Sequence, residues 1–147
     1  MVQGGKANEA LVKLDKIIAG AHEDERTSLT FLQVEILSGS GKPKWAVQKI
    51  DQLLTKASGE DEIEMRMLKL QIMASEKMPE AEKAFFEVAE LANSVGLQNS
   101  SAWAVVQMHL EGTAVSPKMV AKARQLVDAA VEAHPVADVL ELSLIHI

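Results

Sequence analysis

The chain has 147 residues, the usual size of one domain, so we expect one continuous fold. Its 15 Lys and Arg residues face 21 Asp and Glu residues, and the resulting formal charge of -6 argues against a nucleic acid or an anionic membrane as partner. The chain contains no Cys, which excludes a disulfide framework, a thiolate zinc site and a cysteine nucleophile.

Hydrophobic residues form 48% of the chain but aromatic residues only 3%, which favours a helical protein rich in Ala, Leu and Met over a sheet. No apolar stretch approaches the roughly 20 residues that span a bilayer. Residues 1–5 lack the basic and apolar regions of a signal peptide. We therefore expect no membrane insertion and a cytoplasmic location.

Proline and glycine divide the chain into runs of helical length. Three prolines that could each open a helix stand 36 and 38 residues apart: Pro43, Pro79 and Pro117. Residues expected to close the preceding helices recur at spacings of 39, 37 and 38: Gly20, Gly59, Gly96 and His134, the last followed by Pro135. These marks predict helices at 7–19, 25–38, 43–57, 61–75, 79–95, 100–111 and 117–133, with another beginning near Val136.

The second helix of each predicted pair carries a small residue followed by small or apolar residues four, seven and eight positions later. The small residues are Ala10, Ala46, Ala84 and Ala123. This spacing forms one stripe along a helix. Arg124 interrupts the otherwise apolar position that follows the alanine, so the last pair is the least regular.

The first helices of the predicted pairs, at 25–38, 61–75 and 100–111, can also be aligned with one another. Two of their columns are Leu29, Met67 and Trp103, and then Gln33, Gln71 and Gln107. We expect the glutamines to hydrogen-bond across a hairpin; the alternative is that they offer amides to a partner. Trp103 is expected to fill the core and Trp45 to cover a hairpin edge. Because we expect no basic residue to accompany either of them, we do not expect them to form a platform on which nucleic-acid bases stack.

This order of residues resembles the tetratricopeptide repeat, with Ala123, Val127, Ala130 and Pro135 similar to that family's second helix and closing proline. The resemblance covers roughly residues 8–141. It implies an all-α solenoid of antiparallel helix pairs with about three to three and a half repeats. The chain departs from the family in having glutamines at its small first-helix position, no Tyr, and a period longer than the family's roughly 34 residues.

The two ends carry a separate hypothesis. The chain begins with a second-type helix and stops as a new first-type helix starts, so we expect residues 1–141 to be a single repeat segment of a longer protein. Residues 142–147 are what CTG-TCT-CTT-ATA-CAC-ATC encodes, which matches a mosaic-end sequencing adaptor. We interpret these six residues as a non-native tail; the alternative is a genuine apolar helix.

No arrangement of residues predicts catalysis, a bound metal or a cofactor. His22, His109 and His134 are spread along the chain without converging donors. We expect structural roles for them, with His22 and His134 at helix ends and His109 half-buried. The acidic residues at 60–64 are expected to open a helix, where they oppose the positive end of its dipole. We expect no enzyme and no small-molecule ligand.

In the resembling family the first helices line a concave groove. Carried over, that geometry implies partner-binding residues at Val34, Leu37, Met65, Leu68, Ile72 and Met108. Such a groove is apolar and partly rich in Met, which suits an amphipathic helix or an extended apolar segment of a protein partner. The alternative is that these side chains pack between successive hairpins.

The leading functional hypothesis is a non-catalytic scaffold that binds a protein or peptide. A second hypothesis is a solenoid segment that positions an attached enzymatic, export or membrane domain. A third is RNA binding of the pentatricopeptide type, which requires a basic groove that the acidic chain does not favour.

Overall fold

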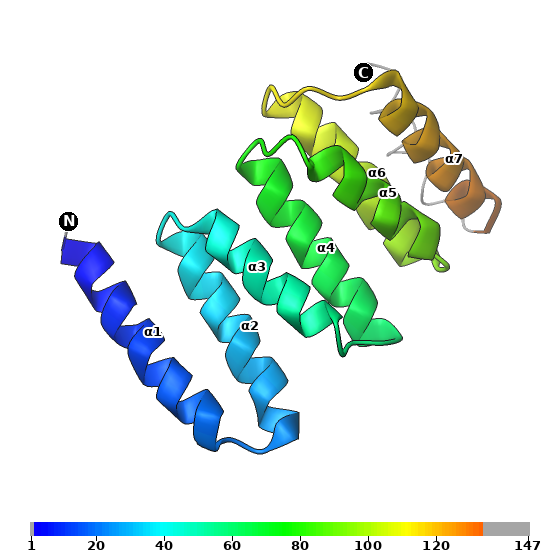
Figure 1. Cartoon of the computed structure of the whole chain (residues 1–147). Helices are drawn as coiled ribbons and strands as arrows, with labels where there is room; N and C mark the ends of the chain where they lie inside the picture. The colour runs from blue at the N-terminus through cyan, green and yellow to red at the C-terminus, as the bar shows by residue number, and fades with distance from the viewer. Residues whose placement is uncertain (1, 134–147) are drawn as a thin grey trace. The chain divides into compact units, whose positions relative to one another are not determined.

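The computed structural model describes the backbone of residues 2–133 and the side chains of residues 5–133. In this range the protein is all-α, with seven helices, no strand and packing between neighbouring helices (Figure 1). The helices are α1 (Val2–Gly20), α2 (Glu23–Gly39), α3 (Pro43–Leu54), α4 (Glu60–Ser75), α5 (Ala81–Leu91), α6 (Val95–Leu110) and α7 (Pro117–Ala133). The helix predicted to begin near Val136, the closing pair at 134–135 and the tail at 142–147 lie outside the described residues.

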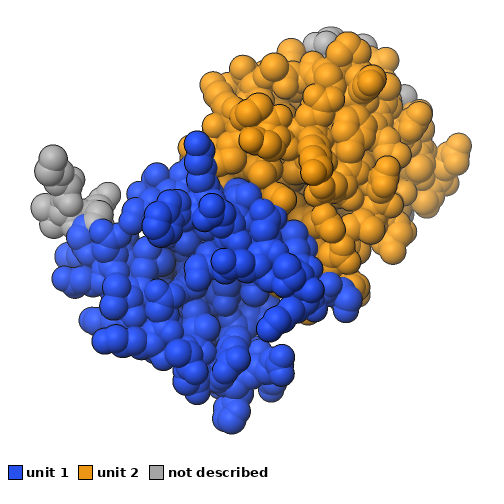
Figure 2. Space-filling view, viewed as in Figure 1, with its two compact units in different colours: residues 1–58 blue, residues 59–147 orange. Residues whose placement is uncertain are grey.

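The chain forms two compact units, residues 1–58 and residues 59–147 (Figure 2). In unit 1, α2 packs against both α1 and α3. In unit 2, α4 pairs with α5 and α6 pairs with α7, and the two pairs contact each other through α4 with α6 and through α5 with α6 and α7. The described part of unit 2 is therefore built from two packed helix pairs. That one continuous array extends over residues 1–141 stays a prediction.

One type of turn ends α2, α4 and α6, which are the first helices of the predicted pairs. The N–H groups of Lys42, Met78 and Thr113 each donate to the carbonyl five residues earlier, at 2.9, 2.8 and 2.8 Å. The residue before each donor has a positive φ, and it is Gly41 (76°), Lys77 (53°) or Gly112 (76°). Its own N–H donates three residues back, which completes a Schellman motif and pairs carbonyls that the helix end would otherwise leave unbonded.

These turns correct the alignment predicted for the first helices. They make Leu37, Met73 and Met108 equivalent, at spacings of 36 and 35 residues, whereas the predicted columns used 38 and 36. The predicted columns are thus displaced by two residues between α2 and α4 and by one between α4 and α6. The error arose because the columns were aligned on similar side chains, such as Gln33, Gln71 and Gln107, and not on the turns that end the helices. In the corrected register Val34, Leu70 and Val105 share a column, and all three are fully buried.

The alanine column of the second helices is confirmed. Ala46, Ala84 and Ala123 are buried, as are the residues four positions later: Ile50, Val88 and Val127. An alanine at this position lets two helices approach closely, and the branched residue one turn on fills the core beside it. The column fails in α1, where Ala10 is only partly buried and Ile17 is exposed.

Several predicted helix boundaries were wrong. The helix expected at 79–95 ends at Leu91, and Gly96 lies inside α6 because Ser94 caps that helix by accepting the N–H of Leu97 at 3.3 Å. Gly59 is the residue before α4, with a φ of 64°, and does not close α3, which ends at Leu54. Pro43 begins its helix as predicted.

Polar side chains link the helices within each unit. In unit 1, the amide of Gln33, 2% exposed, donates to Asp15 Oδ1 at 2.6 Å and so joins α2 to α1. In unit 2, the hydroxyl of Ser116 donates to Glu82 Oε1 at 2.9 Å and accepts the N–H of Met119 at 3.2 Å, so one side chain both caps α7 and contacts α5.

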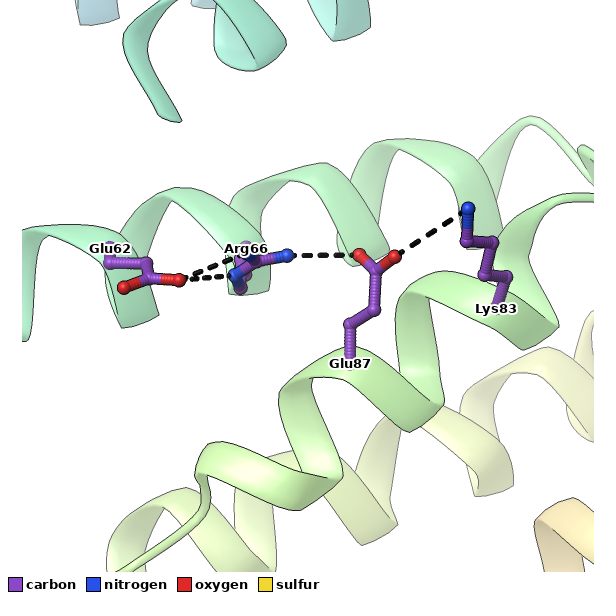
Figure 3. A network of polar contacts seen from close by, with 4 residues as sticks. All are labelled: Glu62, Arg66, Lys83 and Glu87. Atoms are coloured by element: carbon purple, nitrogen blue, oxygen red, sulfur yellow. Dashed lines mark hydrogen bonds and ion pairs between the residues drawn. The ribbon is translucent and has the colours of Figure 1, made fainter. Parts of the chain in front are cut away.

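An arginine connects α4 to α5 (Figure 3). Arg66 Nη2 lies 2.9 Å from Glu62 Oε1 on its own helix, and Arg66 Nη1 lies 3.0 Å from Glu87 Oε2 on the next. Lys83 Nζ is a more distant member, 3.9 Å from Glu87 Oε1. All three members of the short contacts are about one quarter to one third exposed, so water screens them less than it screens a surface pair.

Candidate interaction surface

The structure places most of the predicted partner-binding residues in the protein interior. Five of the six are buried, and only Leu68 is partly exposed; the buried ones are Val34, Leu37, Met65, Ile72 and Met108. Because a buried side chain offers no area to a partner, this arrangement favours the alternative stated with the prediction, that these residues pack within the protein.

A different set of residues on α6 is exposed. Trp103 is 44% exposed and Leu110 is 73% exposed, so the expectation that Trp103 fills the core was wrong. The two are seven residues apart, which is two helical turns and about 10 Å along one face. Ser100 and Gln107 lie on the same face and are also exposed. This face, defined here as the α6 stripe (Ser100, Trp103, Gln107 and Leu110), offers two large apolar groups separated by one amide.

The corrected register extends the position of Trp103 to the other first helices. Its equivalents are Leu68 in α4, partly exposed, and Leu32 in α2, exposed. Within unit 2, α4 packs against α6, so Leu68 and Trp103 occupy matching positions on two contacting helices. Both of these helices therefore leave part of a large apolar side chain accessible to solvent at the same repeat position.

Two glycines in the sequence indicate the corrected alignment of the first helices. Gly41 and Gly112 each follow the end of a first helix, as the glycine of a Schellman turn does. Lys77 stands at the third such position and hides the pattern. With Gly41 and Gly112 taken as the fixed points, Leu32 and Trp103 fall in one column.

A cleft of about 500 Å³ lies where α6 leads into α7. Four apolar residues line it, together with the imidazole of His109 and the guanidinium of Arg124; they are Val115, Pro117, Val120 and Ala121. His109, expected to be half-buried, is exposed, and it directly precedes Leu110 of the α6 stripe. The cleft is open to solvent.

The other singled-out residues have structural surroundings. His22 precedes α2 and its carbonyl accepts the N–H groups of Glu25 and Arg26, which confirms its place at a helix end. The acidic residues from position 60 form the first turn of α4, also as predicted. Within residues 5–133, His, Asp and Glu side chains form no group of three that could hold a metal ion.

The three glutamines of the predicted column have different surroundings. Gln33 is buried and hydrogen-bonded to Asp15, as the structural interpretation expected, although its partner lies on α1 and not across the α2–α3 hairpin. Gln71 and Gln107 are exposed. The corrected register places Lys69 and Ala104 at the position of Gln33, so the three glutamines were never equivalent.

Trp45 has a basic neighbour, contrary to expectation. The Nζ atom of Lys42 lies 5.9 Å from the centroid of the indole ring. A cation at this distance from an aromatic face is attracted by the ring's electrons.

The described residues define an all-α protein of packed helix pairs that presents large apolar side chains from its first helices. Comparisons with protein-family models, with curated proteins and with solved structures find no match to this chain. Among the helices described above, none has both the length and the apolar character needed to cross a membrane.

Proposed function

We propose that this protein is a non-catalytic interaction scaffold of tetratricopeptide-like helix pairs. Its ligand is an amphipathic helix or an extended apolar segment of another protein, bound on the first-helix face of unit 2. The observation that carries the proposal is the exposure of Trp103 and Leu110 on the same side of α6.

The chemistry of the α6 stripe fits such a ligand. Covering a large apolar side chain contributes roughly 1.5–3 kcal/mol, and Trp is among the residues that most often dominate binding energy at protein interfaces. Gln107 lies between Trp103 and Leu110 and can donate to and accept from a ligand backbone. Two apolar residues about 10 Å apart match positions i and i+7 of a bound helix.

The architecture supports the same proposal. Three Schellman turns at spacings of 36 and 35 residues give each first helix the same end, and this repetition holds equivalent side chains at equivalent positions. Proteins built from stacked helix pairs commonly present their repeated faces to protein ligands.

Selection from a library of displayed random peptides tests the proposal even though the natural partner is unidentified. We expect enriched peptides to carry large apolar residues at helical spacing. Fluorescence anisotropy of the labelled peptides then gives their affinity for the full chain. Replacing Trp103 and Leu110 together, Trp103→Ser with Leu110→Ser, should weaken binding at least tenfold, which corresponds to about 1.4 kcal/mol.

A matched control distinguishes specific binding at the α6 stripe from non-specific binding to exposed apolar residues. Val12 and Ile17 are exposed apolar residues of similar exposure on α1. The double variant Val12→Ser with Ile17→Ser removes comparable apolar surface from unit 1 and should leave peptide affinity unchanged. Equal losses in the two double variants, or no enrichment of apolar peptides, would contradict the proposed surface.

A further inference from the structure

Unit 1 carries a second, chemically different surface around Trp45. Trp45 is 64% exposed, which is unusual for a residue with a large aromatic side chain. Lys42 approaches the ring and also donates from Nζ to Asn8 Oδ1 at 2.7 Å, so contacts from α1 and α3 together position its ammonium group. Asn8 takes one of the three N–H donors of that group.

The surroundings of Trp45 in the sequence are basic. Between Glu35 and Asp51 the chain has no acidic residue and three lysines: Lys42, Lys44 and Lys49. Lys49 is four residues after Trp45 on α3, hence on the same face of the helix. The N-terminus of α3 begins at Pro43, and its helix dipole adds positive potential at the same place. We name Lys42, Lys44, Trp45 and Lys49 the Trp45 patch.

We propose that the Trp45 patch binds a short acidic segment of a protein partner. Carboxylates of the segment pair with the lysine ammonium groups, and an apolar side chain beside them covers the exposed indole. The Trp45 patch is separate from the α6 stripe and lies at α3 in unit 1. It binds an acidic ligand, whereas the α6 stripe binds an apolar one, so it goes beyond the proposed function.

The size and charge of the patch favour a short peptide over a long polyanion. Lys42 and Lys49 are about 10 Å apart along the helix axis, which an extended segment of about three residues spans. The three lysines carry a charge of +3. The formal net charge of the chain is -6, so the formal net charge of all its other residues is -9. A nucleic acid or an anionic membrane extends past the patch and meets that negative charge, whereas a short acidic segment does not.

Trp45 itself reports binding. The chain has two tryptophans, so Trp103→Phe leaves Trp45 as the only indole. We expect a blocked peptide of three glutamates and one leucine, titrated into this full-length variant at low salt, to give a saturable change in tryptophan emission. Adding Lys42→Ser, Lys44→Ser and Lys49→Ser should weaken binding more than tenfold.

The control removes the same charge elsewhere. Lys13, Lys16 and Lys118 are exposed lysines outside the patch, and replacing all three by Ser should change the affinity less than threefold. Circular dichroism verifies that both triple variants remain folded. Replacing Leu110 by Ser should not affect this titration, which keeps the result independent of the α6 stripe.

Three outcomes would overturn the proposal. The first is equal weakening in the patch and control variants, which indicates a general charge effect. The second is an equal emission change with a peptide in which glutamine replaces glutamate. The third is tighter binding of a single-stranded oligonucleotide or of phosphatidylserine vesicles than of the acidic peptide, since the patch then belongs to a polyanion.

Discussion

Lys77 has a φ of 53°, a backbone conformation that L-residues adopt at a cost because Cβ approaches the following carbonyl. The equivalent positions in the other two turns hold Gly41 and Gly112, which lack that Cβ. Lys77 is exposed, so its side chain gains little packing in return. The α4–α5 turn is therefore the strained one of the three.

Replacing Lys77 by Gly is expected to stabilise the protein. Removing the Cβ relieves the left-handed strain, and the greater freedom of glycine in the unfolded chain offsets part of the gain. We expect the free energy of unfolding to rise by about 0.5–1 kcal/mol. Urea denaturation followed by circular dichroism measures it.

The reverse change provides the counterpart. An added Cβ at Gly112 would contact nothing within 4 Å, so any effect of Gly112→Ala comes from its φ of 76° and not from crowding. We expect a loss of about 1 kcal/mol in the same measurement. A neutral result at both positions would show that these turns are not left-handed.

Arg66 is the residue on which the α4–α5 ion pairs depend. Arg66→Met keeps much of the apolar stem but removes the contacts to Glu62 and Glu87, and we expect the free energy of unfolding to fall by about 0.5–1.5 kcal/mol. Lys83 is 82% exposed and its contact is longer, so Lys83→Met is the control and should change stability by less than about 0.3 kcal/mol. If the two variants lose equal stability, Arg66 does not link the helices as described.

At the scale of the helix, the two halves of each hairpin differed in how well the sequence predicted them. The second helices have a single buried stripe with an alanine at its start, so their phase could be read from apolar spacing alone. The first helices of unit 2 are apolar around much of their circumference. In α6, for example, Ala104, Val105 and Val106 are consecutive and all buried, so periodicity could not set the phase.

The lengths of the links limit what the prolines indicate about the first helices. The links that follow the first helices are Ser40–Lys42, Glu76–Glu80 and Glu111–Ser116. Pro43 and Pro79 each stand two residues after the positive-φ residue of the turn, but Pro117 stands five residues after Gly112, so the prolines mark the first two turns and not the third. An alignment based on left-handed turn residues would have been correct, but Lys77 does not show its conformation in the sequence.

The alanine column is testable by overpacking. Ala84 is buried within unit 2, and Ala84→Met inserts a larger side chain between packed helices, which should cost about 1–3 kcal/mol. Ala129 is exposed on α7, so Ala129→Met supplies the same substitution without crowding and should be close to neutral. The midpoint of thermal unfolding measures both; an unchanged midpoint for Ala84→Met would place that alanine outside the core.

For the molecule as a whole, the apolar core is distributed unequally. Of the buried hydrophobic residues in the described part of the chain, six belong to unit 1 and twenty to unit 2, and α1 contributes only Leu14. Few buried contacts mean that a segment opens at low free energy. The described part of unit 1, and α1 above all, should therefore be the less protected part of the chain.

Hydrogen exchange followed by mass spectrometry checks this distribution. We expect peptides from α1 to exchange first, then those from α2 and α3, with α6 protected longest because six of its sixteen residues are buried. The order of exchange, not its absolute rate, is the result that matters. Protection of α1 equal to that of α6 would contradict the inferred imbalance.

The candidate surface was less predictable than the fold. The all-α class follows from composition and spacing, but whether a first-helix side chain is buried depends on a register that differs by one or two residues from the predicted one. A shift of one residue rotates a side chain by about 100° around the helix, which is enough to exchange interior for surface. Val34 and Leu32 illustrate this, because they are two residues apart and lie on opposite sides of that boundary.

The hairpin links also show where this protein can be altered safely. In the α6–α7 link, Gly112 and Thr113 complete the turn, and Ser116 begins the cap of the next helix. Ala114 and Val115 lie between them, outside the backbone hydrogen bonds that form the turn. A fluorescent label or short epitope inserted between Ala114 and Val115 would lengthen the part of the hairpin that already varies most, and so provides an attachment point that leaves the paired helices intact.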